Sequence, residues 1–434
     1  MDMLIRINTE REHLFSPDIH VGITAGISKV IEAGRIRAAL KAMCFKHPLL
    51  ASAIVFDENN VAFYKLNSSK PILIEFSENS CNESWQQWIT RSNHKPFDFE
   101  KGPLMRIRVA YSAGATTITA LGHHMLGDGL SFYFFMRDLL NALDGKTDGA
   151  QLLPPIIQDA SALPKAARPG FLGRLLAKSL NRNYRRSGKR FSYGDYSALY
   201  QDYNFNKKPA LSTFFLSPDE TATVIFNCRR HNVTVNEAVS TAFFAARREA
   251  GIQSSYLGVS CNIRKEMVAD PLDSMGNYVS GVFIQADYDD SLDFWANAGK
   301  TGGQLKAKLK DDHTRLIVLG LLDALDDTLL DAVNFAGSGG YRNKTAQKLC
   351  GILCGVPSEG LGVSNLGRQT AIYEHFSLEE MYFIPPLFAS NDFIAGVITV
   401  NNAMYFCLRY AEADLDPASV SALFGRAKAL LLGN

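Results

Sequence analysis

Residues 116–143 read TTITALGHHMLGDGLSFYFFMRDLLNAL, with two different periodicities on the two sides of one loop. The alternating apolar run at 116–121 predicts a strand, and the apolar residues at helical spacing over 130–143 predict an amphipathic helix. His123 and His124 therefore fall in a strand-to-helix loop that ends with Asp128 and Gly129. Loops of this kind commonly carry the chemically active side chains of a rigid scaffold.

Strand-like and helix-like stretches alternate on both sides of this unit, which is typical of an α/β or α+β fold. Further strands are expected at 51–56, 61–64, 104–111, 212–216, 256–263, 278–286, 362–364, 396–400 and 404–410. A helix is expected at 27–44, before Pro48, because proline cannot continue a helix. A second is expected at 234–250, with Thr234 or Asn236 as its N-cap. Asn401 and Asn402 predict a hairpin turn.

The length of 434 residues exceeds what one hydrophobic core usually serves, so two domains are expected. We expect an N-terminal domain at 1–160 that carries the histidine loop and a C-terminal domain at 206–434. The segment 161–205 between them is basic and begins in a proline-rich region, which is typical of a crossover linker.

The overall composition argues against several classes of protein. A net charge of +1 does not favour nucleic acid as a partner. The seven cysteines are odd in number and scattered, which favours reduced thiols. No run approaches the ~18 apolar residues of a membrane span, and the N-terminus lacks a signal-peptide pattern. We therefore expect a soluble cytoplasmic protein, and we expect it to be a monomer.

The histidine loop has the residue types needed for proton transfer. A histidine can accept a proton near neutral pH, so it suits a general base acting on a hydroxyl or amine. Asp128 can hold the loop by pairing with a cation elsewhere in the chain. Taken alone, the same residues also fit a purely structural loop or a partial metal site without its remaining ligands. Cys350 and Cys354 are four positions apart, but no further spacing completes a zinc site, so no metal is expected.

Five short motifs in the same order resemble the HHxxxDG acyltransferase superfamily, which includes chloramphenicol acetyltransferase, condensation domains, alcohol acetyltransferases and polyketide-associated acyltransferases. The first motif is the complete HHxxxDG element at 123–129. The others are HPLL at 47–50, PFDFEKGPL at 96–104, NIR at 262–264 and GNY at 276–278. The DFGWG signature of plant members is missing, which argues against that branch.

The resemblance implies two similar chloramphenicol-acetyltransferase-like domains, each with a mixed sheet and helices, and an active-site tunnel at their interface. It implies that His124 is the general base, that His123 is mainly structural, and that Asp128, followed by Gly129, orients the loop by pairing with Arg264. A buried carboxylate needs such a partner, and arginine stays charged when it is desolvated.

Residues 364–367 lie where relatives pass a short loop from the second domain under the tunnel. There, Ser364, Asn365 or Gly367 can supply a donor to the oxyanion of a tetrahedral intermediate. An ordinary turn is the alternative interpretation.

Residues 168–190 contain eight basic and no acidic side chains. Arg182, Arg185 and Arg186 can recognise the phosphates of coenzyme A, an acidic acyl-carrier protein or a membrane surface. The alternative is a helix that lies on the protein with one solvated face, since Leu172, Leu175, Leu176 and Leu180 recur at helical spacing.

The predicted function is acyl transfer from a thioester, either acyl-CoA or an acyl-phosphopantetheine on a carrier protein, to a small-molecule alcohol or amine. The thioester is a co-substrate, and no bound cofactor is expected. A free-standing O-acyltransferase is favoured, because the sequence shows no adenylation or carrier domain. The alternatives are a condensation-type enzyme that forms an amide between carrier-bound substrates, and a non-catalytic member that binds an acylated partner.

Overall fold

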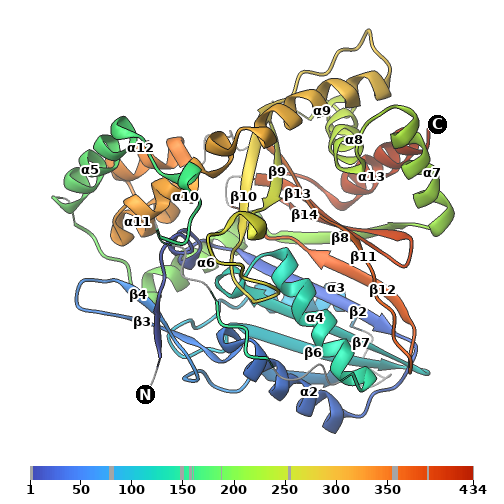
Figure 1. Ribbon diagram of the computed structural model, residues 1–434, viewed down its shortest axis with the longest axis horizontal. Helices are drawn as coiled ribbons and strands as arrows, with labels where there is room; N and C mark the ends of the chain where they lie inside the picture. The colour runs from blue at the N-terminus through green and yellow to red at the C-terminus, as the bar shows by residue number, and fades with distance from the viewer. Residues whose placement is uncertain are drawn as a thin grey trace.

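Three β-sheets organise the chain (Figure 1). The structure is a computed structural model, and it describes residues 3–77, 83–146, 151–155, 159, 161–186, 188–252, 256–353, 360–388 and 391–433.

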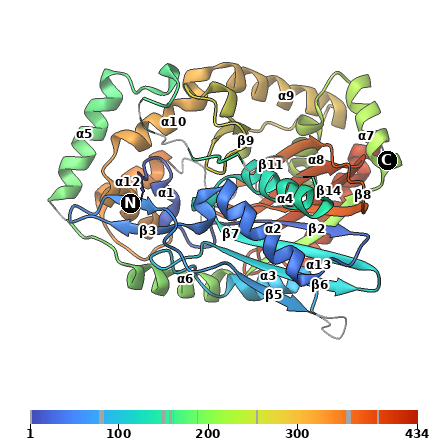
Figure 2. The ribbon, with the colours of Figure 1, turned by 60° about the horizontal axis from the view of Figure 1, so that its bottom comes forward.

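The first sheet has the strand order β12-β2-β7-β6-β5. Its strands are β2 (His20–Ile27), β5 (Leu73–Ser77), β6 (Met105–Ser112), β7 (Ala115–His123) and β12 (Leu378–Ile384). The sheet is mixed, because β5 runs parallel to β6 while the other neighbours are antiparallel. Helix α4 (Gly129–Asp144) packs against β2 and against helix α2 (Ala33–Lys46), which lies beside it in Figure 2, and α3 spans Trp85–Asn93.

The second sheet has the order β10-β9-β11-β13-β14-β8. Its strands are β8 (Pro209–Leu216), β9 (Tyr256–Asn262), β10 (Val279–Gln285), β11 (Gly360–Gln369), β13 (Asn391–Val400) and β14 (Ala403–Ala411). It is also mixed, because β11 runs parallel to both neighbours. Its helices are α7 (Pro218–Arg230), α8 (Val235–Glu249), α9 (Phe294–Lys310) and α13 (Pro417–Leu432). The predicted class of two α/β lobes with mixed sheets is therefore confirmed.

Strand β12 ties the two lobes together. It comes late in the chain, yet it pairs antiparallel with β2 and completes the first sheet. Its Tyr382 ring packs edge to face against Tyr405 of β14, with ring centroids 5.0 Å apart. The first sheet therefore requires a strand from the C-terminal half of the chain.

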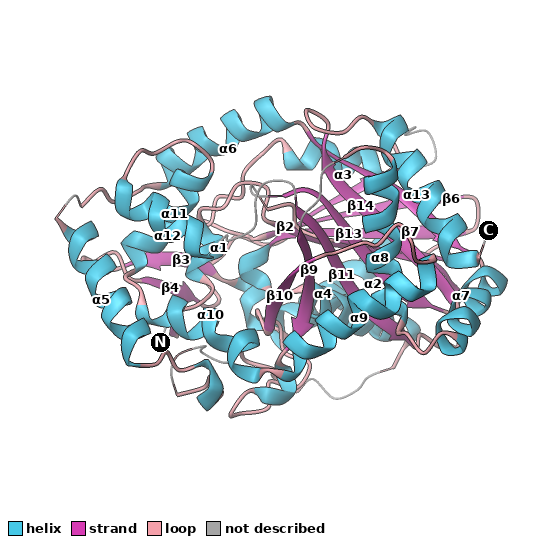
Figure 3. Cartoon of the chain, turned by 90° about the horizontal axis from the view of Figure 1, so that it is seen from above, coloured by secondary structure: helices cyan, strands magenta, loops and turns pink. Residues whose placement is uncertain are grey.

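A third, small sheet and a group of helices form one end of the molecule (Figure 3). The sheet is β1-β4-β3, built from β1 (Leu4–Arg6), β3 (Ala53–Phe56) and β4 (Ala62–Lys65). The helices are α1 (Arg11–Leu14), α5 (Phe171–Arg185), α6 (Tyr193–Lys207), α10 (Asp312–Ala324), α11 (Asp327–Gly337) and α12 (Lys344–Leu353). The segment expected as a linker is thus largely helical, and the domain boundaries stay a prediction.

Several expected elements differ in detail. The helix expected from residue 27 begins at Ala33, because Ile27 pairs with Thr116 at the end of β2. The short strand expected at 362–364 extends over Gly360–Gln369. Residues 364–367 are therefore not a free loop, and they lie in β11 around an irregularity in its pairing with β13.

The predicted hairpin turn is confirmed, because Asn401 and Asn402 have φ of +49° and +64°.

Candidate active site

His123 is the last residue of β7 and is held from three sides. It lies opposite His20 in the register with β2, and its N–H donates to the carbonyl of Leu104 at 2.9 Å. Its Nδ1 accepts the N–H of Met125 at 3.2 Å. Burial, and secondly the neighbouring His124, lower the pKa of His123 to about 3. The ring is therefore neutral and positioned within the protein.

His124 begins the 3-10 turn η2 (His124–Leu126), which connects β7 to α4. Its backbone N–H donates to the Ile19 carbonyl, and its own carbonyl accepts a hydrogen bond from the Asn277 side-chain amide at 2.8 Å. Burial lowers the pKa of His124, while the charge of Asp128 and a hydrogen bond from Asn277 oppose that shift. Its Nδ1 is buried and has no hydrogen-bond partner in the described parts of the chain. The result is a neutral imidazole with capacity to take a proton.

Gly127 allows the loop to close against the C-terminal half. It has φ of +147°, and a Cβ there would lie 2.5 Å from the Ser131 side chain and 2.9 Å from the Gly276 nitrogen. A larger residue would be strained in its backbone and would push these segments apart.

The Asp128 carboxylate makes four hydrogen bonds, and two of them reach the C-terminal half of the chain. Its Oδ1 accepts the N–H and the hydroxyl of Ser131, at 2.8 and 3.0 Å, and so caps α4. The same oxygen accepts Nη2 of Arg264 at 3.1 Å. Its Oδ2 accepts the N–H of Tyr278 at 3.0 Å. The expected pair between Asp128 and Arg264 is therefore present, and both side chains are buried.

Arg264 is held by more than this carboxylate. Its Nη2 also donates to the Ser131 hydroxyl at 2.8 Å, and its guanidinium lies over the Tyr278 ring at 4.4 Å. The Asn262 side chain accepts the backbone N–H of Arg264 at 3.0 Å. The Gly276 carbonyl accepts from Ser131 and from the Asp128 N–H. The NIR and GNY motifs thus converge on the HHxxxDG loop.

Gly129 lies where β11 and β12 approach the start of α4. A Cβ on Gly129 would lie 2.6 Å from the Phe383 ring and 2.9 Å from the Leu366 side chain. This contact brings the 364–367 stretch to the first turn of α4. Within the described chain, the Asn365 side chain accepts the N–H of Gly367 at 2.8 Å and makes no hydrogen bond to the histidine loop. The oxyanion role of Ser364, Asn365 and Gly367 stays a prediction.

Three neighbours of the loop were not expected from the sequence. The His13 ring, from α1, lies 4.4 Å from the His124 ring at an angle of 35°. His20 places Nδ1 2.8 Å from the side-chain oxygen Oδ1 of Asn93, and the Tyr64 hydroxyl donates to the Met125 carbonyl at 2.7 Å. Burial, followed by the two loop histidines, lowers the pKa of His13 well below its usual value. Single histidines and tyrosines far from the motif have no spacing that identifies them.

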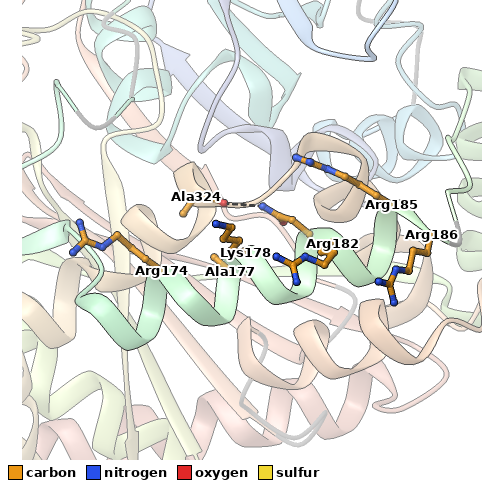
Figure 4. Close-up of a pocket in the computed structure, with 8 residues that line it drawn as sticks. Arg174, Ala177, Lys178, Arg182, Arg185, Arg186 and Ala324 are labelled. Atoms are coloured by element: carbon orange, nitrogen blue, oxygen red, sulfur yellow. Dashed lines mark hydrogen bonds between the residues drawn. The ribbon is translucent and has the colours of Figure 1, made fainter.

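Of the three arginines considered for donor docking, Arg182 and Arg185 lie on α5 and Arg186 is its C-cap residue. Helix α5 lies away from α4 in Figures 1, 2 and 3. The three arginines line a surface hollow of about 660 Å³ together with Arg174 and Lys178 (Figure 4). Arg185 is ion-paired with Asp326 at 2.6 Å. The structure therefore groups Arg182, Arg185 and Arg186 with one another and not with His124.

Several other features of the described residues bear on cofactors and partners. Among the described residues, no group of three or more His, Cys, Asp or Glu side chains is arranged to hold a metal ion. Among them, no helix has both the length and the apolar character required to span a bilayer. Cys350 lies in α12, and Cys354 lies outside the described residues.

Comparison with known proteins places this site in a family context. Residues 18–159, which include the whole histidine loop, match the family model of the Condensation domain. Over 121 residues the chain is 27% identical to bacitracin synthase 2 of Bacillus licheniformis, an alignment that covers 28% of this chain and 4% of that protein. The chain thus spans a small part of this curated relative.

Solved structures extend the likeness to the whole chain. The first condensation domain of the CDA synthetase aligns at 13% identity with a TM-score of 0.67, covering 99% of this chain and 95% of that one. Polyketide synthase associated protein 5 from Mycobacterium tuberculosis aligns at 13% identity with a TM-score of 0.61, covering 99% and 98%. The fold is that of a condensation domain, and the resemblance to the HHxxxDG superfamily is confirmed.

Proposed function

We propose that this protein is an acyltransferase that moves an acyl group from a thioester to an alcohol or amine, with His124 as general base. One observation carries the proposal. His124 is neutral, and it follows a strand end that is fixed on both sides. A general base needs this combination of available proton capacity and restricted position.

In the proposed reaction, His124 removes the proton from the acceptor hydroxyl or amine as that group attacks the thioester carbonyl. The new C–O or C–N bond forms, and the tetrahedral intermediate then expels the thiolate by breaking the C–S bond. The imidazolium returns its proton to the thiolate, so His124 ends the cycle neutral. No covalent acyl-enzyme is required.

The network around Asp128 supports this role without taking part in the chemistry. The Asp128 carboxylate is 4% exposed and makes four hydrogen bonds, which leaves it little freedom to act as a second base. Its charge favours the imidazolium that forms during the reaction, since an opposite charge stabilises the protonated form. We therefore assign Asp128 and Arg264 positioning roles.

The acceptor is either an alcohol or an amine. Amide formation between carrier-bound substrates has at least equal support to ester formation, because the matched sequence family is the Condensation domain. The match to the Condensation domain does not favour an alcohol acceptor over an amine acceptor.

An assay with matched substrates tests the proposal. Purified protein is given the same acyl group on coenzyme A and on a phosphopantetheinylated carrier protein, with alcohol and amine acceptors of equal chain length. Mass spectrometry of the products then identifies the preferred pair. Product formation that requires both substrates and His124 supports the proposal. Acyl-thioester binding without transfer for every pair would instead favour a non-catalytic acyl-binding protein.

A further inference from the structure

Helix α5 exposes large apolar side chains on its first two turns. Phe171, Leu172, Leu175 and Leu176 are exposed by 68%, 79%, 48% and 37%. Phe171 and Leu175 are four positions apart, as are Leu172 and Leu176, so the four side chains form one continuous outward face. Single exposed apolar residues are normal on a protein surface, whereas a contiguous group marks a place of contact.

The opposite face of α5 is already occupied. Ala177, Leu180 and Tyr184 are buried in the hydrophobic core. Asn181 donates to the Ala324 carbonyl at 3.1 Å and accepts the Asp326 N–H at 3.0 Å, which attaches the helix to α10 and the start of α11. The exposed apolar face therefore does not arise from a loosely attached helix.

A ridge of cations runs beside the apolar face. Its members recur every four residues along the helix: Arg174, Lys178, Arg182 and Arg186. Figure 4 shows their side chains extending from α5. Within the described parts of the chain these four make no ion pair, unlike Arg185. Residues 168–190 contain no acidic side chain, so the segment itself supplies no charge to balance these four cations.

We propose that α5 binds an anionic membrane surface, lying in its plane with Phe171, Leu172, Leu175 and Leu176 inserted among the acyl chains. The neighbouring cations then meet lipid phosphates and carboxylates. An amphipathic helix with apolar residues on one face and Lys and Arg beside them has the chemistry of an interfacial helix. The apolar and cationic groups lie side by side on one helix, so a single surface with an apolar interior and anionic headgroups can meet both. This inference does not depend on the proposed function.

Co-sedimentation of the whole protein with vesicles tests the proposal, using phosphatidylcholine alone and phosphatidylcholine mixed with phosphatidylserine. We expect binding to the anionic vesicles, weaker binding to the neutral ones, and a decline as salt screens charges within a Debye length of ~8 Å at physiological ionic strength. Each cation near an anionic surface contributes about five-fold in partitioning, so three neutral replacements should lower binding on the order of 100-fold.

Two triple variants separate the contributions. The charge variant is Arg174→Gln, Lys178→Gln and Arg182→Gln, and the apolar variant is Phe171→Ser, Leu172→Ser and Leu175→Ser. The matched control lies on α7, at the other end of the molecule in Figures 1 and 3, where Phe226 is 63% exposed beside two exposed arginines. It is Phe226→Ser, Arg229→Gln and Arg230→Gln. All positions are exposed, so the melting temperatures should match that of the parent.

We expect both α5 variants to lose vesicle binding and the α7 control to keep it. Equal losses in all three variants would overturn the proposal, because binding would then follow general surface charge and apolarity. A parent protein that ignores anionic vesicles at physiological salt would also overturn it. In that case, a raised KM for a carrier-linked thioester in the charge variant alone would identify α5 as a carrier-protein surface.

Discussion

Arginines do two different things in this protein. Arg264 is buried, shares the Asp128 carboxylate with the cap of α4, and lies over the Tyr278 ring. The arginines of α5 are exposed, and Arg174, Lys178, Arg182 and Arg186 carry no ion pair in the described chain. A buried charge must be satisfied within the fold, whereas an exposed charge is available to a partner outside it. Changes at the histidine loop should therefore be insensitive to salt, and changes on α5 should depend on it.

The largest expected effect lies at His124, the proposed general base. His124→Ala should lower kcat by at least about 100-fold, because a positioned general base contributes 10²–10⁴ in rate. Circular dichroism and the melting temperature should show a folded protein. The control is His94→Ala, an exposed histidine at the end of α3. Turnover near that of the parent in folded His124→Ala protein would reject the mechanism.

The buried pair comes next. Asp128→Ala and Arg264→Ala should each cost about 3–5 kcal/mol in the free energy of unfolding, because each leaves one buried charge without its partner. The double variant should cost much less than the sum. Denaturant unfolding of the four proteins measures this coupling. Strictly additive losses would reject the pair as a unit.

An exposed ion pair on α5 sharpens that comparison. Arg185 and Asp326 are also joined by two hydrogen bonds, at 2.6 and 2.8 Å, but the arginine side chain is 70% exposed. The same double-mutant cycle on this pair should give at most about 1 kcal/mol, because solvent and salt screen exposed charges. A coupling as large as that of the buried pair would contradict the distinction drawn between the two regions.

A smaller effect is expected at the other histidine. His123→Ala should lower kcat less than His124→Ala does, because His123 holds the loop and does not face a substrate in this assignment. It should cost about 1–3 kcal/mol in stability, since the buried N–H of Met125 loses its acceptor. A loss of kcat equal to that of His124→Ala, with unchanged stability, would assign His123 a direct chemical role.

The smallest effect is a shift along the pH axis. Burial lowers the pKa of His124 from its ordinary 6.5, so the folded protein keeps this base neutral to lower pH than a free imidazole does. The acid limb of the kcat/KM profile should therefore lie below pH 6.5. Asp128→Asn should move it lower still, because the Asp128 charge raises the pKa of His124. An acid limb at or above 6.5 in the parent, or an upward move in the variant, would contradict this account.

Local sequence patterns predicted many elements of both lobes and the loop of the candidate site. The strands at β6 and β7, the helix at α4 and the N-cap Thr234 of α8 all follow from short-range periodicity and capping chemistry. The sequence also predicted the contact between Asp128 and Arg264. The resemblance of the HHxxxDG and NIR motifs identified these two residues as partners, although they are 136 positions apart. Periodicity missed β2 and β12. All of β2 and the last four residues of β12 are buried, so these stretches do not alternate between buried and exposed positions.

Other features were decided by packing across the whole chain. The contact between the His13 and His124 rings, and the pairing of β12 with β2, join segments that share no local pattern. The sequence did not determine which face of α5 is buried, because its leucines also fit a helix packed on the protein. In the structure Leu180 is buried while Leu172 is exposed. Sequence spacing identifies which residues share a face of an element, whereas the burial of that face depends on which distant elements the chain brings against it.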